Sequence, residues 1–398
     1  MIASPNQLGD LNVSNESDTI QTRTTEPAPA SSRRKFLKGA AVTAAGATTA
    51  LAAPNISRAQ TTSIKMQGAW APQDILNEFA TDYVDRVNAM GGGRLKIEYL
   101  VSGSVVKAFS VYDAVNDGVL DAGHTVPAYV YGKNKAASLF GTGPCFGWDA
   151  HQAIAWIYFG GGDALHTELM QEILGFNIVS FFSTPMPPQP LGWFKKPVKS
   201  IADMQGLKYR TVGLATEVMQ NMGLAVTQIP GGEIIPAMER GVIDAFEFNN
   251  PTSDRLLGAP DVAKHYMLGS YHQANEFFEI IFNKNVYDGL APEQQAILKH
   301  ASEAASSATL WKAFDRYSKD LDALQKEDGV TVHRTPQDVF TAELDAWDKV
   351  VDQLSSDDFF KKVIASQKDW AKRVGYYVLF NNVDTQLAYE HYFGELNI

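Results

Sequence analysis

The chain has 398 residues, of which 45% are hydrophobic and 20% are charged, and its formal net charge is −11. This composition predicts a folded protein long enough for two domains, and it excludes disorder over most of the length. The acidic balance argues against nucleic acid or an anionic membrane surface as a partner. Cys145 is the single cysteine, so we expect no internal disulfide.

The first 59 residues have the features of an export signal. Residues 1–30 are rich in Ser, Thr, Asn and Pro, and SRRKFLK (32–38) is a twin-arginine pattern. The weakly apolar run at 39–53 is too short to span a bilayer. Small residues at Ser57 and Ala59 predict cleavage between Ala59 and Gln60, and so a protein exported folded to the periplasm. The other interpretation is a basic patch before a flexible linker.

The remaining chain alternates strand and helix patterns. In chain order, the first half predicts strands at 63–70, 94–100, 119–123 and 177–183, and helices at 74–90, 109–117 and 151–173. The second half predicts strands at 206–211, 225–230 and 276–283, and helices at 214–222, 232–240, 291–326, 336–352 and 357–395. This alternation is typical of parallel α/β sheets. No segment after the signal has 18 uninterrupted apolar residues, so we expect no membrane span.

An internal repeat suggests two similarly built lobes. AVNDGVLDA (114–122) resembles AMERGVIDA (237–245), and each combines a helix end, a glycine and a short strand with Asp-Ala. A chance match between two ordinary helix-to-strand turns is the alternative. If the repeat is real, a ligand is expected in the cleft between the two lobes.

Signatures of catalysis are absent from the sequence. It contains no GxSxG, HExxH, P-loop or dinucleotide-binding pattern, and its eight histidines lack zinc-site spacing. Residues suited to binding an anion or a hard cation occur instead in PPQPLGWFK (187–195), GLKYRT (206–211) and DAFEFNNP (244–251). We therefore expect a binding protein rather than an enzyme, with no catalytic cofactor.

Over residues 62–395 the chain resembles the solute-binding proteins of tripartite ATP-independent periplasmic (TRAP) transporters. It is most similar to the branch that binds 2-oxo and 2-hydroxy monocarboxylates such as pyruvate and lactate. The segments that carry the resemblance are GGGRLKIEYL, SGSVVKAFSVYDAV, GVLDAGH, YGKNKAASLF, QPLGWFKKP, GLKYRT and GGEIIPAMERGVIDAFEF, together with the twin-arginine leader.

The resemblance implies a two-lobed α/β periplasmic binding protein fold with hinge strands and C-terminal helices. After the leader (1–59), lobe 1 is expected at 60–184 with 282–330, lobe 2 at 185–281, and the C-terminal helices at 331–398. The implied partners are a small organic acid and the permease subunits of a TRAP transporter. The C-terminal helices either pack on their own lobes or form a homodimer.

The resemblance also implies the residues of the site. Arg210 is expected to pair with the substrate carboxylate, because a guanidinium offers two parallel donors that match it. Gln189, Glu247 and the backbone carbonyl of Phe248 are expected to hold a cation, Na⁺ or Ca²⁺. This branch has Trp where the chain has Phe248, so the aromatic wall is smaller and the substrate size is open.

Three further residues are candidates for the pocket wall. Trp70 follows the first strand, Tyr129 offers a hydroxyl, and Asn250 precedes a proline near Glu247. Counting Arg210 and a monovalent cation against Glu247 and a monocarboxylate balances the charge of the predicted site.

Other functions remain open at this point. One is metal-independent binding of a dicarboxylate or sugar acid. Another is a sensory binding protein that serves no permease. A remote one is an exported, cofactor-dependent enzyme, since folded export often serves proteins that carry a cofactor.

Overall fold

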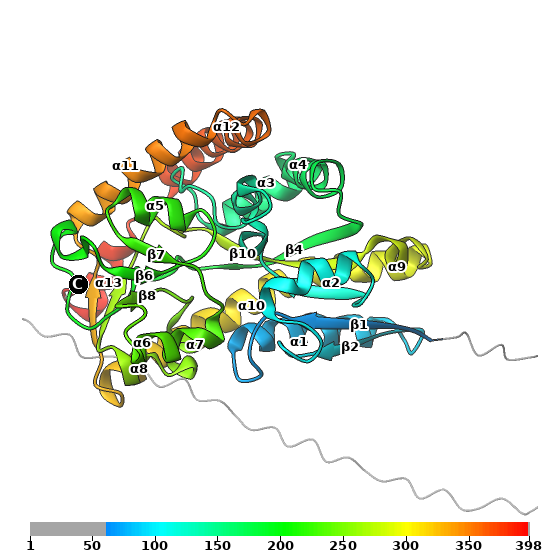
Figure 1. Cartoon of the computed structure of the whole chain (residues 1–398), viewed down its shortest axis with the longest axis horizontal. Coiled ribbons are helices and arrows are strands. Elements are labelled where there is room, and N and C mark those ends of the chain that lie inside the picture. Colours follow the sequence, from blue (N-terminus) through cyan, green and yellow to red (C-terminus); the bar gives the residue numbers. More distant parts are fainter. Residues whose placement is uncertain (1–60, 397–398) are drawn as a thin grey trace, which may run out of the picture. The chain divides into compact units, whose positions relative to one another are not determined.

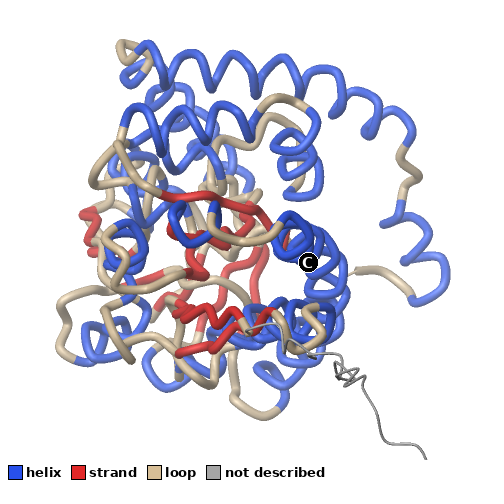
Figure 2. The backbone as a smooth tube through the Cα atoms, turned by 90° about the vertical axis from the view of Figure 1, so that its right-hand side faces the viewer, coloured by secondary structure: helices blue, strands red, loops and turns tan. Residues whose placement is uncertain are grey.

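The computed structural model describes residues 61–396. The expected leader, twin-arginine segment and cleavage site lie outside the described residues. Within residues 61–396 no helix is long and apolar enough to cross a membrane. In Figure 2 helices lie around the strands.

The strands form two sheets. The first sheet has the order β2-β1-β3-β10-β4. Its strands are β1 (Thr62–Gly68), β2 (Leu95–Leu100), β3 (Ala122–Thr125), β4 (Ile178–Met186) and β10 (Glu276–Asn283). The second sheet has the order β11-β9-β5-β8-β6-β7. Its strands are β5 (Gly192–Phe194), β6 (Lys208–Arg210), β7 (Ala225–Thr227), β8 (Ala245–Phe246), β9 (His265–Leu268) and β11 (Thr331–Arg334). Each sheet and its helices form one lobe.

The expectation of parallel sheets is wrong for part of each sheet. β1, β2 and β3 pair in parallel, but β10 is antiparallel to both β3 and β4. In the second sheet β5 is antiparallel to β8 and β9. The reason is the path of the chain: β10 returns from the second lobe to the first and enters the first sheet in the opposite direction.

Thirteen helices within the described residues surround the sheets (Figure 1). The helices associated with the first sheet are α1 (Ile75–Met90), α2 (Val111–Asn116), α3 (Ala150–Phe159), α4 (Gly162–Thr167) and α9 (Lys284–Asp288). Those of the second sheet are α5 (Ala215–Asn221), α6 (Ile234–Glu239), α7 (Pro251–Leu257) and α8 (Ala259–Val262). The long α10 (Pro292–Lys326) packs against α1 and β4 on one side and α7 on the other, so it joins the two lobes.

The chain ends in α11 (Gln337–Leu354), α12 (Asp358–Asn381) and α13 (Thr385–Phe393). The single helix expected at 357–395 is therefore two helices. The helix expected at 151–173 is also divided, because Gly161 has a φ of 87° between α3 and α4. A π-helical turn, Glu168–Ile173, follows α4. Short 3-10 helices lie at Ala108–Ser110, Pro127–Val130, Lys135–Phe140, Ile201–Met204 and Gly231–Glu233.

The internal repeat is confirmed down to single hydrogen bonds. Gly118 and Gly241 have φ values of 74° and 68°, which end α2 and α6 in the left-handed region. Asp121 then accepts a hydrogen bond from the Lys65 N–H at 2.7 Å, where β1 runs alongside. Asp244 accepts from the Lys208 N–H at 3.1 Å, at the start of β6. Each aspartate thus anchors its short strand to the neighbouring parallel strand.

Candidate functional site

Arg210 is the last residue of β6, and only 1% of it is exposed. Its Nε donates to the Ile229 carbonyl at 2.9 Å, in the loop after β7. Its Nη1 donates to the Glu247 carbonyl at 2.8 Å and to Glu247 Oε1 at 3.0 Å. These bonds hold the guanidinium in one orientation, while Nη2 makes no hydrogen bond to residues 61–396.

Glu247 follows β8 and is fully buried. Its backbone N–H donates to the Arg210 carbonyl at 3.2 Å, so the two residues are tied together by both backbone and side chain. Oε2 has no hydrogen-bond partner within residues 61–396. Burial raises the pKa of Glu247 to about 8, even though Arg210 and the nearby Thr211 hydroxyl act in the opposite direction. The ion pair alone therefore does not offset the desolvation of this carboxylate.

A second buried carboxylate, Glu276, lies beside this pair. Glu276 begins β10, and its Oε2 accepts from Gln189 Nε2 at 2.5 Å and from Asn249 Nδ2 at 2.7 Å. Burial raises its pKa to about 7, while the charge of Arg210 lowers it. The Glu276 charge in turn raises the pKa of Glu247. The structure thus brings Arg210, Glu247, Gln189 and Glu276 into one buried polar cluster.

Gln189 lies in the loop before β5 and is 1% exposed. Its backbone N–H donates to the Gln273 carbonyl at 3.1 Å, which places it next to the segment that leads into β10. Its Oε1 has no hydrogen-bond partner in the described part of the chain. Gln189 Oε1 and Glu247 Oε2 are thus an amide oxygen and a carboxylate oxygen, both buried and both without a hydrogen-bond partner in residues 61–396. Hard cations prefer oxygen ligands of these types.

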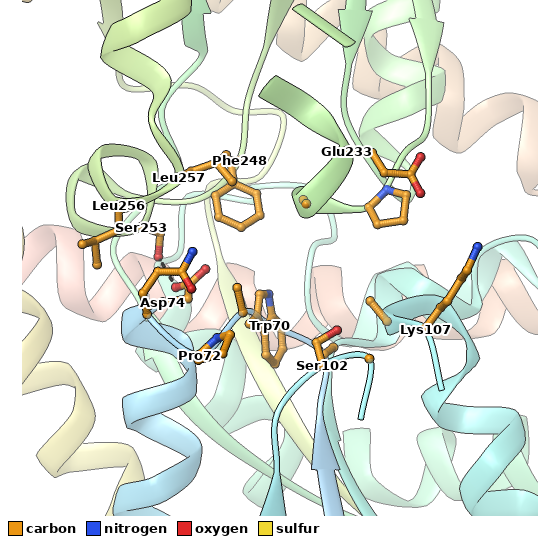
Figure 3. A pocket seen from close by; sticks show the side chains of 18 of the residues that line it. Trp70, Pro72, Asp74, Ser102, Lys107, Glu233, Phe248, Ser253, Leu256 and Leu257 are labelled. Carbon is orange, nitrogen blue, oxygen red and sulfur yellow. Dashed lines mark hydrogen bonds between the residues drawn. The ribbon is translucent and has the colours of Figure 1, made fainter. Parts of the chain in front are cut away.

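An apolar cavity of about 490 Å³ adjoins the polar cluster (Figure 3). Three aromatic candidates, Trp70, Tyr129 and Phe248, all line it. In Figure 3 Trp70 and Phe248 approach from opposite sides of the cavity. The Arg210 guanidinium carbon lies 5.9 Å from the centre of the Phe248 ring. Phe248 therefore belongs to both the cavity and the polar cluster.

Tyr129 also connects the cavity with the cluster. Burial raises the pKa of its hydroxyl, and the charges of Arg210, Glu276 and Glu247 act on it as well. The hydroxyl is therefore protonated at neutral pH and can donate a hydrogen bond near the charged groups.

Asn250 has a local structural function. It is the N-cap of α7, where its Oδ1 accepts from the Ser253 N–H at 2.9 Å. Its Nδ2 donates to Asn249 Oδ1 at 2.6 Å and to Ser253 Oγ at 3.0 Å. Direct contact between Asn250 and a ligand stays a prediction.

The donor set is compatible with a cation held mainly by oxygen atoms. Within residues 61–396 no group of three or more His, Cys, Asp or Glu side chains is arranged to hold a metal ion. A cation at the cluster would therefore need amide, carbonyl and ligand oxygens in addition to carboxylates. Gln189, Glu247, Glu276 and the Phe248 carbonyl supply these types.

Glu276 and Asn249 were not among the predicted site residues. EFFEIIFN (276–283) looks like a core strand, and all eight of its residues are indeed buried. The signal that could have revealed Glu276 is the carboxylate itself, because a charge at the end of an apolar strand needs a partner.

Comparison with known proteins agrees with this architecture. The family model described as bacterial extracellular solute-binding protein, family 7, matches residues 66–360. A monocarboxylate 2-oxoacid-binding periplasmic protein of Nostoc sp. (strain PCC 7120) is 32% identical over 371 residues, which are 90% of this chain and 98% of that protein.

Three solved structures of TRAP transporter solute-binding proteins are also similar. The protein from Bordetella bronchiseptica, a dimer with copurified calcium and picolinate, has a TM-score of 0.77 and 28% identity, and the match covers 84% of this chain and 97% of that one. The protein from Colwellia psychrerythraea, with calcium and pyruvate, has a TM-score of 0.76 and 29% identity, with coverage of 84% and 100%. The protein from Pseudoalteromonas atlantica, with sodium and pyruvate, has a TM-score of 0.76 and 28% identity, with the same coverage.

The family match and the Nostoc relative both extend over most of the chain, and the fold is that of the solved two-lobed proteins. The chain therefore belongs to family 7 of the bacterial extracellular solute-binding proteins, the DctP family, whose members serve TRAP transporters.

Proposed function

We propose that this protein is the periplasmic solute-binding component of a TRAP transporter and that it captures a small 2-oxo or 2-hydroxy monocarboxylate, such as pyruvate or lactate, together with a cation. The loaded protein delivers the acid to the membrane permease, and no bond is made or broken. The observation that carries the proposal is the pair of buried oxygens without partners in residues 61–396, Gln189 Oε1 and Glu247 Oε2, beside Arg210. The bound ligands of the Colwellia and Pseudoalteromonas proteins support it.

Arg210 is the proposed partner of the ligand carboxylate. Protein acceptors orient its Nε and Nη1, and Nη2 retains its hydrogen-bonding capacity for a ligand. A fixed guanidinium recognises a carboxylate by direction as well as by charge. The Tyr129 hydroxyl, which lies within the field of the same charges, is a second donor for the ligand oxygens.

Gln189, Glu247, Glu276 and the Phe248 carbonyl are the proposed protein ligands of the cation. Glu276 changes the charge balance that the sequence suggested. Glu247, Glu276 and the bound acid contribute three negative charges, which Arg210 and a divalent cation match. We therefore favour Ca²⁺ over Na⁺. When bound, such an ion neutralises buried carboxylates and chelates the 2-oxo or 2-hydroxy acid through two of its oxygens.

Calorimetry on the chelator-treated protein in sodium-free buffer tests this proposal. We expect pyruvate or lactate binding to be weak without cation and to be restored most strongly by Ca²⁺. Glu276→Gln should weaken the Ca²⁺-dependent binding at least about tenfold, the equivalent of about 1.4 kcal/mol. Glu279→Gln is the matched control, because Glu279 is also buried on β10 but bonds to Tyr112 instead. Undiminished binding after chelation would instead favour a metal-independent dicarboxylate or sugar acid.

Export by the twin-arginine pathway is part of the same proposal. The double variant Arg33→Lys/Arg34→Lys should leave the precursor in the cytoplasm, whereas Arg23→Lys, outside the motif, should not. Mass spectrometry of the periplasmic protein should give a chain that begins at Gln60. A protein found in the periplasm despite the double variant would show that another route exports it.

We further propose that the C-terminal helices form a homodimer. The end of α12 together with α13 carries an exposed apolar surface, the C-terminal apolar face. Its members are Tyr376, Tyr377, Leu379, Phe380, Val383, Leu387, Tyr389, Tyr392 and Phe393. No residue of α13 is buried, and the large side chains of Phe380 in α12 and Phe393 in α13 are 82% and 75% exposed. An apolar surface of this kind usually marks an interface.

A second copy of this chain is the proposed partner, as the dimeric Bordetella relative suggests. Light scattering after size exclusion should give a dimer for the native chain and a monomer for Phe380→Asp/Phe393→Asp. Val119→Asp, which changes another exposed apolar side chain, should stay dimeric. A monomeric native chain at micromolar concentration would contradict this assignment.

A further inference from the structure

The cavity beside the polar cluster is much larger than a three-carbon acid needs. Its volume is about 490 Å³. If each heavy atom takes no more than the roughly 30 Å³ share of a liquid water molecule, the six heavy atoms of pyruvate fill at most about 180 Å³. More than half of the cavity would remain even if pyruvate lay wholly within it. The carboxylate end, moreover, belongs next to Arg210, which does not line the cavity.

The cavity persists although the two lobes are already in direct contact. On one side Ser253 Oγ of α7 donates to Asp74 Oδ1, the cap of α1, at 2.6 Å, and both residues are buried. Elsewhere the Tyr131 hydroxyl and the Lys135 ammonium of the first lobe donate to Glu217 of α5. With these contacts in place, the space is lined by residues of both lobes, among them Trp70 and Phe248.

The walls of the cavity are mainly apolar. In Figure 3 Trp70 and Phe248 face each other across it, and the lining also includes Pro230, Ile235 and Leu257. The Phe248 ring packs closely on Gly231, where an added Cβ would lie 2.4 Å from it. This apolar surface adjoins the polar cluster, which is the arrangement of a head-group site with an apolar side-chain site.

Charged side chains in the lining give no attraction for a second carboxylate. Lys107 is basic, but Asp74 and Glu233 also line the cavity and are acidic. One positive and two negative groups leave the lining without net positive charge. A dicarboxylate would therefore place its second charge among more acidic than basic groups.

We infer that the preferred ligand is a 2-oxo monocarboxylate with a bulky apolar side chain, branched or aromatic, rather than pyruvate itself. This inference rests on the proposed function, because it assigns the carboxylate and 2-oxo group to the polar cluster. Trp70, Phe248, Pro230, Ile235 and Leu257 then form the site for the side chain. Burial of the added methyl and methylene groups supplies the preference.

Calorimetry of the mature protein in calcium buffer tests this with pyruvate, 4-methyl-2-oxopentanoate, phenylpyruvate and 2-oxoglutarate. We expect 4-methyl-2-oxopentanoate or phenylpyruvate to bind at least about tenfold more tightly than pyruvate, since one or two methylenes in an apolar pocket suffice for that ratio. Equal or tighter binding of pyruvate would overturn the inference and leave the proposed function intact. Tightest binding of 2-oxoglutarate would overturn it in favour of a dicarboxylate site. Binding of none of these acids would overturn the proposed function as well.

A cavity-filling variant locates the side-chain site. Leu257→Trp should weaken binding of the bulky acid at least about tenfold while the pyruvate affinity changes by less than about threefold. Leu344→Trp is the control, because it adds the same indole to a 40% exposed leucine of α11 that does not line the cavity. An equal loss for both acids in Leu257→Trp would show that this wall does not distinguish them. If Leu257→Trp is unstable, the affinities of the native chain for the series of acids test the inference instead.

Discussion

The two copies of the helix-to-strand unit, 114–122 and 237–245, share a backbone design but differ in the residues around it. In each copy a glycine with positive φ ends the helix, and an aspartate bonds to the neighbouring parallel strand. The pairing registers then place Gln67 of β1 opposite Gly123 and Arg210 of β6 opposite Phe246. Gln67 and Arg210 therefore occupy equivalent positions in the two sheets.

Both side chains hold a nearby loop, but only one of them carries a charge. Gln67 donates to the Val106 carbonyl and accepts from the N–H groups of Val105 and Val106, so its amide oxygen accepts two bonds and one of its two N–H groups is used. Arg210 donates in the same way to Ile229 but keeps a charge and further N–H groups. The comparison teaches that the two lobes share a scaffold, and that the proposed recognition of a carboxylate relies on a charged side chain at one of two matching positions.

The residues that follow Gly123 and Phe246 also differ between the two copies. His124 is buried against the Trp70 and Phe278 rings, at centroid distances of 4.9 and 5.4 Å. Glu247 occupies the corresponding place after β8 and pairs with Arg210. One copy thus continues into an aromatic core, and the other into a buried charge cluster.

Replacing Arg210 with the residue at the equivalent position of the first sheet should have the largest effect on ligand binding. Arg210→Gln copies the residue of the first sheet, and we expect it to abolish binding of 2-oxo acids. Loss of a buried charge partner costs roughly 2–5 kcal/mol, which removes micromolar binding. Calorimetry measures the loss, and circular dichroism shows that the fold persists. Lys208→Gln, at the exposed start of the same strand, is the control. Unchanged affinity in Arg210→Gln would remove Arg210 from the binding site.

The next largest effect is the pH dependence of stability that His124 contributes in the first copy. Burial lowers the pKa of His124 from 6.5 to about 3. Between these values the unfolded chain binds a proton that the folded chain does not, so His124 reduces stability as the pH falls, by up to about 1.4 kcal/mol per unit. His124→Gln should remove this slope.

Urea unfolding at pH 6.5 and pH 5 measures the difference. The native chain should lose about 2 kcal/mol more than His124→Gln over this interval. The exposed His151, changed to Gln, should leave the slope of the native chain intact. Parallel profiles for His124→Gln and the native chain would contradict the assignment.

The smallest effect tests whether the two aspartates are equivalent. Asp121→Asn and Asp244→Asn each weaken a bond between a carboxylate and a strand N–H, which contributes roughly 1–2 kcal/mol. We expect similar losses of unfolding free energy in both variants. A difference larger than about 1 kcal/mol would mean that only one copy depends on its aspartate.

Much of the architecture could be predicted because it depends on local patterns. The helix at 74–90 is confirmed as α1, which Asp74 caps by accepting from the Leu76 N–H. The repeat could be recognised because its glycines and aspartates recur at the same spacing within nine residues, although each aspartate bonds to a strand 56 or 36 residues away. Arg210 could be placed at a strand end for the same reason.

The remainder depends on distant parts of the chain. The antiparallel direction of β10 is set by a return from the other lobe, which leaves no local mark in EFFEIIFN. β5, β9 and β11 are only three or four residues long and were not predicted. Glu276 was missed because its partners, Gln189 and Asn249, come from two other segments that meet it only in the folded chain.

The bond between Ser253 and Asp74 has a consequence for the transport cycle. It joins the lobes through protein groups alone, as do the bonds of Glu217 to Tyr131 and Lys135. Part of the free energy of closure is therefore available to the empty protein, and a fraction of empty molecules shares the shape of loaded ones. In the proposed transport cycle, empty closed molecules would compete with loaded ones for the permease. The strength of these three carboxylate hydrogen bonds, one of them an ion pair, would then help to set the background against which the transporter detects its cargo.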